Sequence, residues 1–448
     1  MGTGARILRA FPFKRSILSI ALCTLSLAVQ GQDIEQENWN AKFQATYVYQ
    51  SKRILPAGYS GQNSLRTAQE RSYSFTSTAA LGYRPWSNGE VYFNPEVALG
   101  VPLSGLTGLG GFSNGEIARV SGPSPTLYRA RLFARQTIGL GAGRESVEGD
   151  ANQLAGSMDK RRVVLTVGNL SVIDIFDDNA YSHDPRTQFM NWSIMTPGAY
   201  DYAADARGYS AGIAIEYFHD EWAVRAGRFA QPREPNQLPL EYRLTRHYGD
   251  QIEIEHAHKV YEQPGKIRLL AYRNRALMSR YEDALDPANQ TGPVPSLADV
   301  RSRDRTKRGF GINLEQAIGP DLGAFLRSMW SDGRTETYAF TEIDRSFSSG
   351  MILRGNRWRR ALDSVGLALS RNGLSAQHRN YLARGGLGFF IGDGRLDYRA
   401  EQIFETFYSY GINKTNQVSI DYQRIANPAY NADRGPVTIV SLRLHTEF

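Results

Sequence analysis

The chain has 448 residues, a formal net charge of +7, 43 glycines and one cysteine, and 11% of its residues are aromatic. A lone cysteine excludes a fold held by disulfides within the chain, and no segment reaches the ~18 apolar residues that a membrane-spanning helix needs. Because many aromatic and glycine residues occur with a mean hydropathy of −0.42 and without a linker-like segment, the composition favours one large β structure over several soluble domains.

The first 31 residues have the pattern of a secretory signal peptide. Basic residues ending at Arg15 precede an apolar run over residues 17–29, and small residues surround a candidate cleavage site after Gly31. Cleavage there removes Cys23 and four of the 52 Lys and Arg residues, so that 48 remain against 45 Asp and Glu and the net charge falls from +7 to +3. The mature chain, 32–448, is therefore expected to be exported, and its charge gives no indication of nucleic-acid binding.

Apolar and polar side chains alternate from residue 39 to the C-terminus with the period of two that β-strands have. In the first run, Trp39, Phe43 and Tyr47 share one face, opposite Lys42 and Gln44. Further runs of the same kind cover residues 73–83, 91–99, 127–136, 209–217, 310–314, 401–410, 418–422 and 440–448.

The segments between these runs are of two lengths. Short turns with residues that suit tight hairpins occur at 85–89, 219–221, 319–321 and 392–394. Long polar segments cover 51–71, 100–124, 174–203, 230–249 and 276–307. Segment 139–162 is long for a turn, and 375–384 is expected to form a short helix or a loop. Short connections alternating with long ones are typical of an outer-membrane barrel, with short periplasmic turns and long extracellular loops.

The polar face of the runs distinguishes a membrane barrel from a soluble one. A soluble barrel buries its apolar face. Here the opposite face is rich in Glu, Arg, Asn and Gln, and Tyr and Trp gather near the ends of the runs, as in the interfacial girdles of membrane barrels. We therefore predict an all-β, antiparallel transmembrane β-barrel, with a soluble sandwich or propeller as the alternative.

The run 127–136 (LYRARLFARQ) carries an unusual number of guanidinium groups. Alternation places Tyr128 and Leu132 toward lipid. The arginines that it places toward water are Arg129, Arg131 and Arg135. A guanidinium presents a fixed fork of donors that can take the place of water around sugar hydroxyls. The alternative is that these arginines only pair with carboxylates of the lumen.

Charged residues on other strands are expected to face the same lumen. Arg225 lies opposite Trp222 and Val224, while Glu401 and Glu405 share one face of their run. We expect the two glutamates to face the arginines across the channel and to accept hydrogen bonds from sugar hydroxyls. A charge ladder with neighbouring strands is the alternative. Their spacing along a strand is too wide for a catalytic carboxylate pair.

Residues 176–192 (FDDNAYSHDPRTQFMNW) form a polar segment too long for a turn. We expect it to fold inward and narrow the channel, with Asp184, Arg186 and Trp192 lining it and aromatic rings stacking on a pyranose. An ordinary solvated extracellular loop is the alternative. The acidic residues lack the spacing of a calcium loop. His256 and His258 continue the lipid side of their run, so neither feature is expected to bind a metal.

Six stretches have a residue order that general barrel constraints do not explain. They are SPTLYRARLFARQTIGLG at 124–141, ANQLAG at 151–156, FDDNAYSHDPRTQFMNW at 176–192, AYDYAADARGYSAG at 199–212, QPREPN at 231–236 and GGLGFFIGDGRLDY at 385–398. They resemble the carbohydrate-selective porins of Gram-negative outer membranes (OprB-type). The resemblance covers most of the mature chain and implies a barrel of about 16 strands through which sugars diffuse. Residues 331–358 match no motif of that family.

We therefore predict an outer-membrane porin for passive diffusion of mono- or small oligosaccharides through a polar, arginine-lined channel. The alternatives are a general porin with a mild anion preference, and a barrel-embedded enzyme or structural barrel without conductance. No Ser, His and Asn arrangement indicates an enzyme, and no cofactor is implied. The expected partners are sugars, outer-membrane lipid and, through the terminal Phe448, the barrel-assembly machinery; a homo-oligomer is left open.

Overall fold

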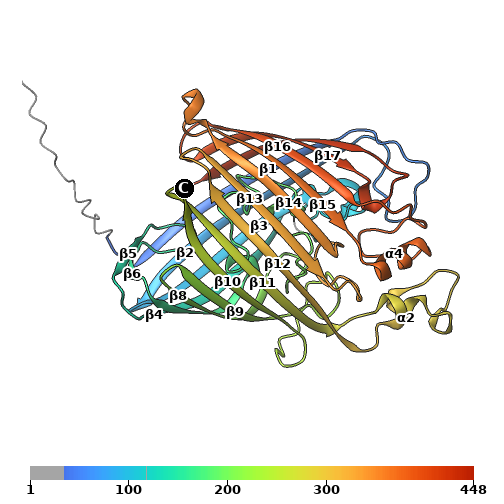
Figure 1. Ribbon diagram of the computed structural model, residues 1–448, viewed down its shortest axis with the longest axis horizontal. Helices are drawn as coiled ribbons and strands as arrows, with labels where there is room; N and C mark the ends of the chain where they lie inside the picture. Colours follow the sequence, from blue (N-terminus) through green and yellow to red (C-terminus); the bar gives the residue numbers. More distant parts are fainter. Residues whose placement is uncertain (1–34, 118) are drawn as a thin grey trace, which may run out of the picture. The chain divides into compact units, whose positions relative to one another are not determined.

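The protein is a closed β-barrel of sixteen antiparallel strands, which confirms the predicted fold (Figure 1). The computed structural model describes residues 35–117 and 119–448, so the predicted signal peptide lies outside the described residues. The sheet closes where β1 (Trp39–Lys52) pairs with β18 (Val437–Glu447). The other wall strands are β2 (Glu70–Trp86), β3 (Gly89–Val101), β4 (Thr126–Gly139), β7 (Arg162–Leu170), β8 (Ser210–His219), β9 (Trp222–Ala230), β10 (Tyr248–Val260), β11 (Gln263–Leu277), β12 (Asp304–Ala317), β13 (Leu322–Ser331), β14 (Arg345–Arg354), β15 (Ser364–Gly373), β16 (Glu401–Gly411) and β17 (Asn416–Ala426).

The seam between the first and last strands extends to the C-terminal residue. Tyr47 lies opposite Leu444, and Phe43 exchanges both backbone hydrogen bonds with Phe448, at 2.8 and 3.0 Å. The two phenyl rings lie 5.3 Å apart. Because closure leaves no strand edge unpaired, the backbone groups of the wall are hydrogen-bonded within the sheet, as a lipid environment requires.

Apolar side chains of the wall point outward and polar ones point inward. Phe310 and Ile420 are each 60% exposed on the outer face, whereas Gln44, Thr46 and Arg443 are buried inside. This is the reverse of a soluble barrel and the arrangement of a transmembrane one.

Short and long connections lie at opposite ends of the barrel (Figure 1). The long connection 140–161 is an exception at the short-turn end, because it contains a hairpin of β5 (Arg144–Val147) and β6 (Gly156–Asp159). The helix expected at 375–384 is present as α4 (Ala376–Ala383), with Ser375 as its N-cap. By the loop lengths, the end with α2 and α4 in Figure 1 is the extracellular one.

One predicted turn is wrong. Residues 392–394 belong to the long connection 374–400 rather than to a hairpin, and the positive φ of Gly392 and Gly394 shapes that loop. The remaining helical segments are η1 (Leu103–Leu106), η2 (Val172–Asp174), α1 (Trp192–Met195), α2 (Tyr281–Leu285), η3 (Pro287–Asn289), α3 (Leu297–Val300), η4 (Gly355–Trp358) and η5 (Pro428–Tyr430). Among the described residues, no helix has the length and apolarity needed to cross a membrane.

The long connections form an apolar core inside the barrel, whose inner wall is polar. Phe112, Trp192, Phe340 and Phe390 come from four different connections and belong to one buried cluster. Trp192 stacks on Phe340 with ring centroids 4.7 Å apart, and Phe112 meets Phe390 edge to face at 4.9 Å. The lumen is therefore partly filled by folded loops, and solutes have to pass beside them.

Candidate functional site

The arginine-rich strand β4 is interrupted by a bulge opposite Asn94 and Pro95 of β3. A bulge inserts an extra residue and therefore shifts the alternation of side chains. Tyr128 pairs with Glu96 and donates a hydrogen bond to its carboxylate inside the barrel. Arg129 pairs with Pro95 and is exposed on the outer face. The expected orientations of Tyr128 and Arg129 are thus wrong, whereas Arg131 and Arg135 do point inward and Leu132 points outward.

Two cavities lie inside the barrel along the wall formed by β2, β3 and β4. The extracellular one has a volume of about 280 Å³ and lies between this wall and the connections 102–125 and 171–209. The periplasmic one has a volume of about 190 Å³ and includes Lys42, Asn152 and Glu447 in its lining. The residues that line both cavities are Arg131, Asp184 and Arg186. We call these three residues the junction.

Arg186 is held at the junction by two carboxylates. Its Nε donates to Oε1 of Glu116 at 2.8 Å, and its Nη2 lies 3.7 Å from Oε2 of Glu96. Burial alone would lower the pKa of Arg186, but Glu116 and Glu96 outweigh that effect and raise it. Burial raises the pKa of Glu116, and Arg186 opposes that shift. Asp184 accepts from the Arg186 backbone N–H at 3.0 Å and thereby fixes the turn that carries this guanidinium.

Arg131 is held in the same way from the strand side. Its Nε and Nη2 donate to the two carboxylate oxygens of Asp174 at 2.7 and 2.6 Å. Its guanidinium lies 5.3 Å from the ring centroid of Tyr209, which in turn lies 6.2 Å from the ring of Tyr128. The extracellular cavity thus has guanidinium groups beside aromatic rings, and each guanidinium at the junction has a carboxylate partner.

Trp192 and Arg135 lie on either side of the junction. Trp192 lines the extracellular cavity but is only 7% exposed, because Phe340 and Phe112 pack against it. Arg135 lies toward the periplasmic end, where its Nη1 donates to the Asn152 carbonyl at 3.1 Å and lies 3.6 Å from Glu90.

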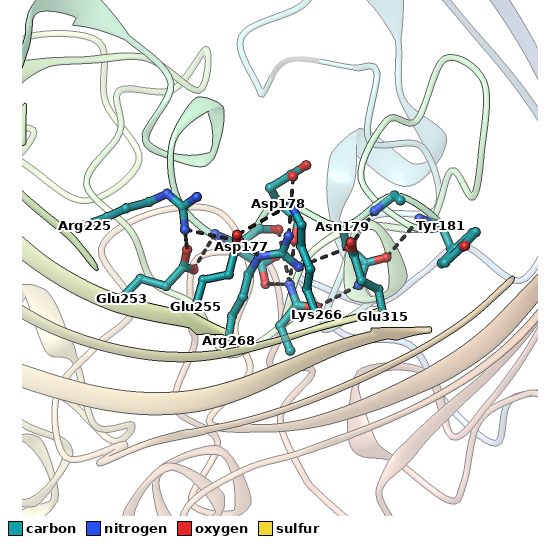
Figure 2. A network of polar contacts seen from close by, with 12 residues as sticks. Asp177, Asp178, Asn179, Tyr181, Arg225, Glu253, Glu255, Lys266, Arg268 and Glu315 are labelled. Atoms are coloured by element: carbon teal, nitrogen blue, oxygen red, sulfur yellow. Dashed lines mark hydrogen bonds and ion pairs between the residues drawn. The ribbon is translucent and has the colours of Figure 1, made fainter. Parts of the chain in front are cut away.

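The connection 171–209 is anchored to the opposite wall by a buried polar network (Figure 2). The Asp177 N–H donates to Glu253 at 2.8 Å, and the Ala180 N–H donates to Glu315 at 2.8 Å. The Asp177 carboxylate accepts from Nε of Arg327 at 3.1 Å. Burial raises the pKa of Asp177, and Arg327 opposes that shift. These contacts hold the segment inside the barrel against β10, β12 and β13.

Arg225 belongs to this network rather than to the junction. Its guanidinium lies 3.0 Å from Glu216, 3.0 Å from Glu253 and 3.2 Å from Glu255, as Figure 2 shows for the last two. Arg268 continues the network, with its Nε 2.6 Å from Glu255. Arg225 therefore pairs with carboxylates of the lumen, which was the alternative that the sequence left open.

Glu401 and Glu405 do not face the arginines across an open channel, contrary to expectation. Both are fully buried. Glu405 accepts hydrogen bonds from the backbone N–H groups of Met190 and Asn191 at 2.6 and 3.1 Å. Glu401 accepts from the N–H groups of Gly110 and Ala429 at 3.0 and 2.9 Å. Their oxygens are occupied by loop backbone, so they attach the loops to the wall.

Several residues of the site could not be identified from the sequence. Glu96 is signalled only weakly, as a charge on the polar side of an apolar strand. Glu116 and Asp174 lie in connections where nothing in the sequence marks them. The unassigned segment 331–358 supplies Phe340 to the buried cluster and Glu342, which accepts from the Phe390 and Ile391 N–H groups at 2.6 and 2.9 Å. The ring of His256 lies 4.3 Å from that of the exposed Trp222, on the outer face as predicted.

The chain resembles known proteins in sequence and in fold. Residues 62–448 match the family model described as carbohydrate-selective porin, OprB family. The fold is similar to that of OprB from Pseudomonas putida, with a TM-score of 0.68 and 15% identity over 92% of this chain and 94% of that one. The channel DcaP of Acinetobacter baumannii has a TM-score of 0.49 and 9% identity over 92% and 97%. No curated protein sequence matches the chain.

Proposed function

We propose, because the chain belongs to the OprB family of carbohydrate-selective porins, that sugars cross its barrel through the two cavities that meet at the junction. The chain is an outer-membrane channel for carbohydrates and not an enzyme. In this proposal Arg131 and Arg186 donate hydrogen bonds to sugar hydroxyls as the solute passes between the loops and the wall of β2, β3 and β4.

The single observation that supports this path is that Arg131, Asp184 and Arg186 line both cavities. A solute that moves from the extracellular cavity to the periplasmic one along this wall therefore meets these side chains. A guanidinium has five N–H donors, and the bidentate pair of Arg131 with Asp174 uses two. The remaining donors can exchange with water and hydroxyls at little net cost, which suits diffusion rather than tight binding.

The pairing of charges at the junction favours neutral sugars over anions. Arg131 is neutralised by Asp174, and Arg186 by Glu116 with Glu96 nearby. A general porin with an anion preference would present unpaired positive charge at its narrowest point. The rings of Tyr128 and Tyr209 add apolar faces on which a pyranose can stack.

The strand β4 offers a matched pair of variants that tests the path. Arg131→Ala removes an inward guanidinium, and Arg129→Ala removes an outward one from the same strand. We expect Arg131→Ala to weaken sugar block of single-channel current in planar bilayers by about tenfold, the effect of losing one hydrogen bond to a charged group, whereas Arg129→Ala leaves it unchanged. Equal sugar block in wild type and Arg131→Ala would refute the path, and block by organic anions alone would favour a general porin.

Three further features belong to the proposal. Residues 1–31 serve as the export signal, Phe448 serves as the recognition residue for the barrel-assembly machinery, and the constriction by residues 176–192 sets the size limit. Support for Phe448 comes from its seam contacts with Phe43. A homo-oligomer is compatible with these features, and its presence is measured by sedimentation in detergent.

A further inference from the structure

The outer face of the barrel carries an apolar groove that the sugar path does not use. It has a volume of about 640 Å³, and most of its lining residues belong to β12, β13, β14 and β15, near the extracellular ends of these strands. Figure 1 labels the four strands. Phe310, Trp330 and Phe347 form its walls and are 60%, 36% and 43% exposed. Ser328 lies opposite Phe347 in the sheet register and is the small residue at the base of the groove.

Two arginines line the same groove and point outward. Arg345 lies opposite Trp330 in register, with its guanidinium 4.8 Å from the centroid of the nearer indole ring. Arg371 lies opposite Phe347 and is exposed. The contacts of Arg345 are with the backbone carbonyls of Ser331 and Asp344. Within residues 35–117 and 119–448, neither arginine has a carboxylate within ion-pair distance.

The position of Arg345 and Arg371 along the barrel indicates which leaflet of the membrane they face. Both lie at the extracellular ends of their strands, which is the side of the outer leaflet in an outer-membrane barrel. Of the other outward arginines nearby, Arg273 pairs with Asp250 and Arg275 with Asp304. Arg308 of β12 lies opposite Arg273 beside the groove, is exposed, and also has no carboxylate partner among the described residues. At the periplasmic end the outer face instead presents exposed aromatic residues such as Trp222. Guanidinium groups without a direct ion-pair partner above an apolar groove match an amphiphile with an acyl chain and an anionic head.

We propose that this groove binds a phosphorylated glycolipid of the outer leaflet. One acyl chain lies against Phe310, Trp330 and Phe347, and a phosphate is bound by Arg345 and Arg371. Arginine suits this role because its planar fork matches two phosphate oxygens. A second copy of the chain is the competing occupant, but a two-fold contact through this groove would place the same two cations of each copy against each other. The proposal requires only the outer-membrane location and is independent of the sugar path.

Native mass spectrometry of the full chain in neutral detergent tests this site. The probes are bis-phosphorylated lipid A, the same lipid after removal of both phosphates, and inorganic phosphate. We expect lipid A to bind and the dephosphorylated form to bind about thirtyfold more weakly, because each cation near an anionic lipid contributes about fivefold. Inorganic phosphate should not displace lipid A, because it lacks the acyl chain. Equal binding of both lipids, or displacement by inorganic phosphate, would overturn the proposal.

Variants test separately the contact with the lipid phosphate, the contact with the acyl chain and the competing occupation by a second copy of the chain. Arg345→Gln with Arg371→Gln should weaken lipid A binding by about thirtyfold, and Ser328→Trp should weaken it by filling the groove. The control Arg424→Gln removes an exposed arginine of β17 outside the groove and should stay within about twofold of wild type. A shift in mobility on boiling verifies that each barrel is folded. Unchanged lipid binding in the double variant overturns the proposal, as does a Ser328→Trp variant that changes only the oligomeric state.

Discussion

Asp177 and Asp178 are adjacent carboxylates in the connection 171–209 with opposite surroundings. The side chains of Asp177 and Arg327 are 1% and 0% exposed and form an ion pair at 3.1 Å. Asn313 donates a further hydrogen bond to Asp177 at 2.7 Å. The side chain of Asp178 is 61% exposed and lies 3.5 Å from Arg268. Asp177→Asn keeps the shape of the side chain but leaves the Arg327 guanidinium buried without its charge partner.

The cost of that change can be estimated from the contacts that remain. Breaking a buried ion pair by removing one partner costs about 3–5 kcal/mol. Arg327 keeps the carbonyls of Ile194 and Asp177 as acceptors, each at 3.1 Å, so we expect the lower end, about 3 kcal/mol. This corresponds to an increase of roughly a hundredfold in the equilibrium for loop release. Asp178→Asn should cost less than about 1 kcal/mol, because exposed ion pairs contribute little.

Hydrogen exchange of the segment 176–192 measures this difference directly. We expect exchange to accelerate by roughly a hundredfold in Asp177→Asn and to stay near wild type in Asp178→Asn, while the wall strands keep their protection. Single-channel recordings of Asp177→Asn should show added current fluctuations, because the released segment moves in the lumen. If the two variants exchange at the same rate, the ion pair with Arg327 does not anchor the loop and the reasoning is refuted.

Two further predictions concern the periplasmic end. Hydrogen bonds from Arg360, Tyr408 and the Gly411 N–H overcome the effect of burial and lower the pKa of Asp363 to about 2. Its stabilising contribution is fully present above the ordinary carboxyl pKa near 4 and is lost as the pH falls through 2. Asp363→Asn should therefore lower the unfolding temperature at pH 7, and the difference from wild type should shrink as the pH is lowered toward and below 2. A pH-independent difference would contradict this. Deletion of Phe448 should reduce the yield of heat-modifiable barrel in outer membranes, because the seam loses its two hydrogen bonds and ring contact with Phe43, and normal yields would contradict it.

The wall of the barrel could be predicted from the sequence because it depends on local alternation. Residues such as Phe43 and Tyr47 recur at a period of two. Apart from the closing pair of β1 and β18, each wall strand pairs with the next wall strand along the chain, so little long-range information is needed. The β4 strand shows the limit of this logic. The bulge opposite Asn94 and Pro95 shifts the alternation by one residue, and nothing in LYRARLFARQ marks it. Pro95 on the neighbouring strand was the available signal, because proline within a sheet often accompanies a bulge.

The interior could not be predicted because its contacts join residues far apart in the chain. Glu405 was correctly placed on the inner face, but its acceptors are used by the backbone of Met190 and Asn191. A strand pattern indicates which way a carboxylate points and not what meets it there. Arg225 is occupied in another way, because its partners Glu216, Glu253 and Glu255 lie on the two adjacent strands of the wall. The folded loops and the ion pairs between strands together decide which inward charges are left to line a path.

Arginine has two proposed roles, one inside the barrel and one on its outer face. The presence or absence of a carboxylate partner distinguishes the two. Arg131 and Arg186 face inward and have carboxylate partners within 3 Å, so they keep directional donors while losing most of their attraction for anions. Arg345 and Arg371 face outward without such partners in the described chain and retain that attraction. Arg131→Ala should therefore change sugar block and not lipid binding, and the Arg345→Gln, Arg371→Gln pair should do the reverse. If either set of variants changed both measurements, pairing would not be what separates the two roles.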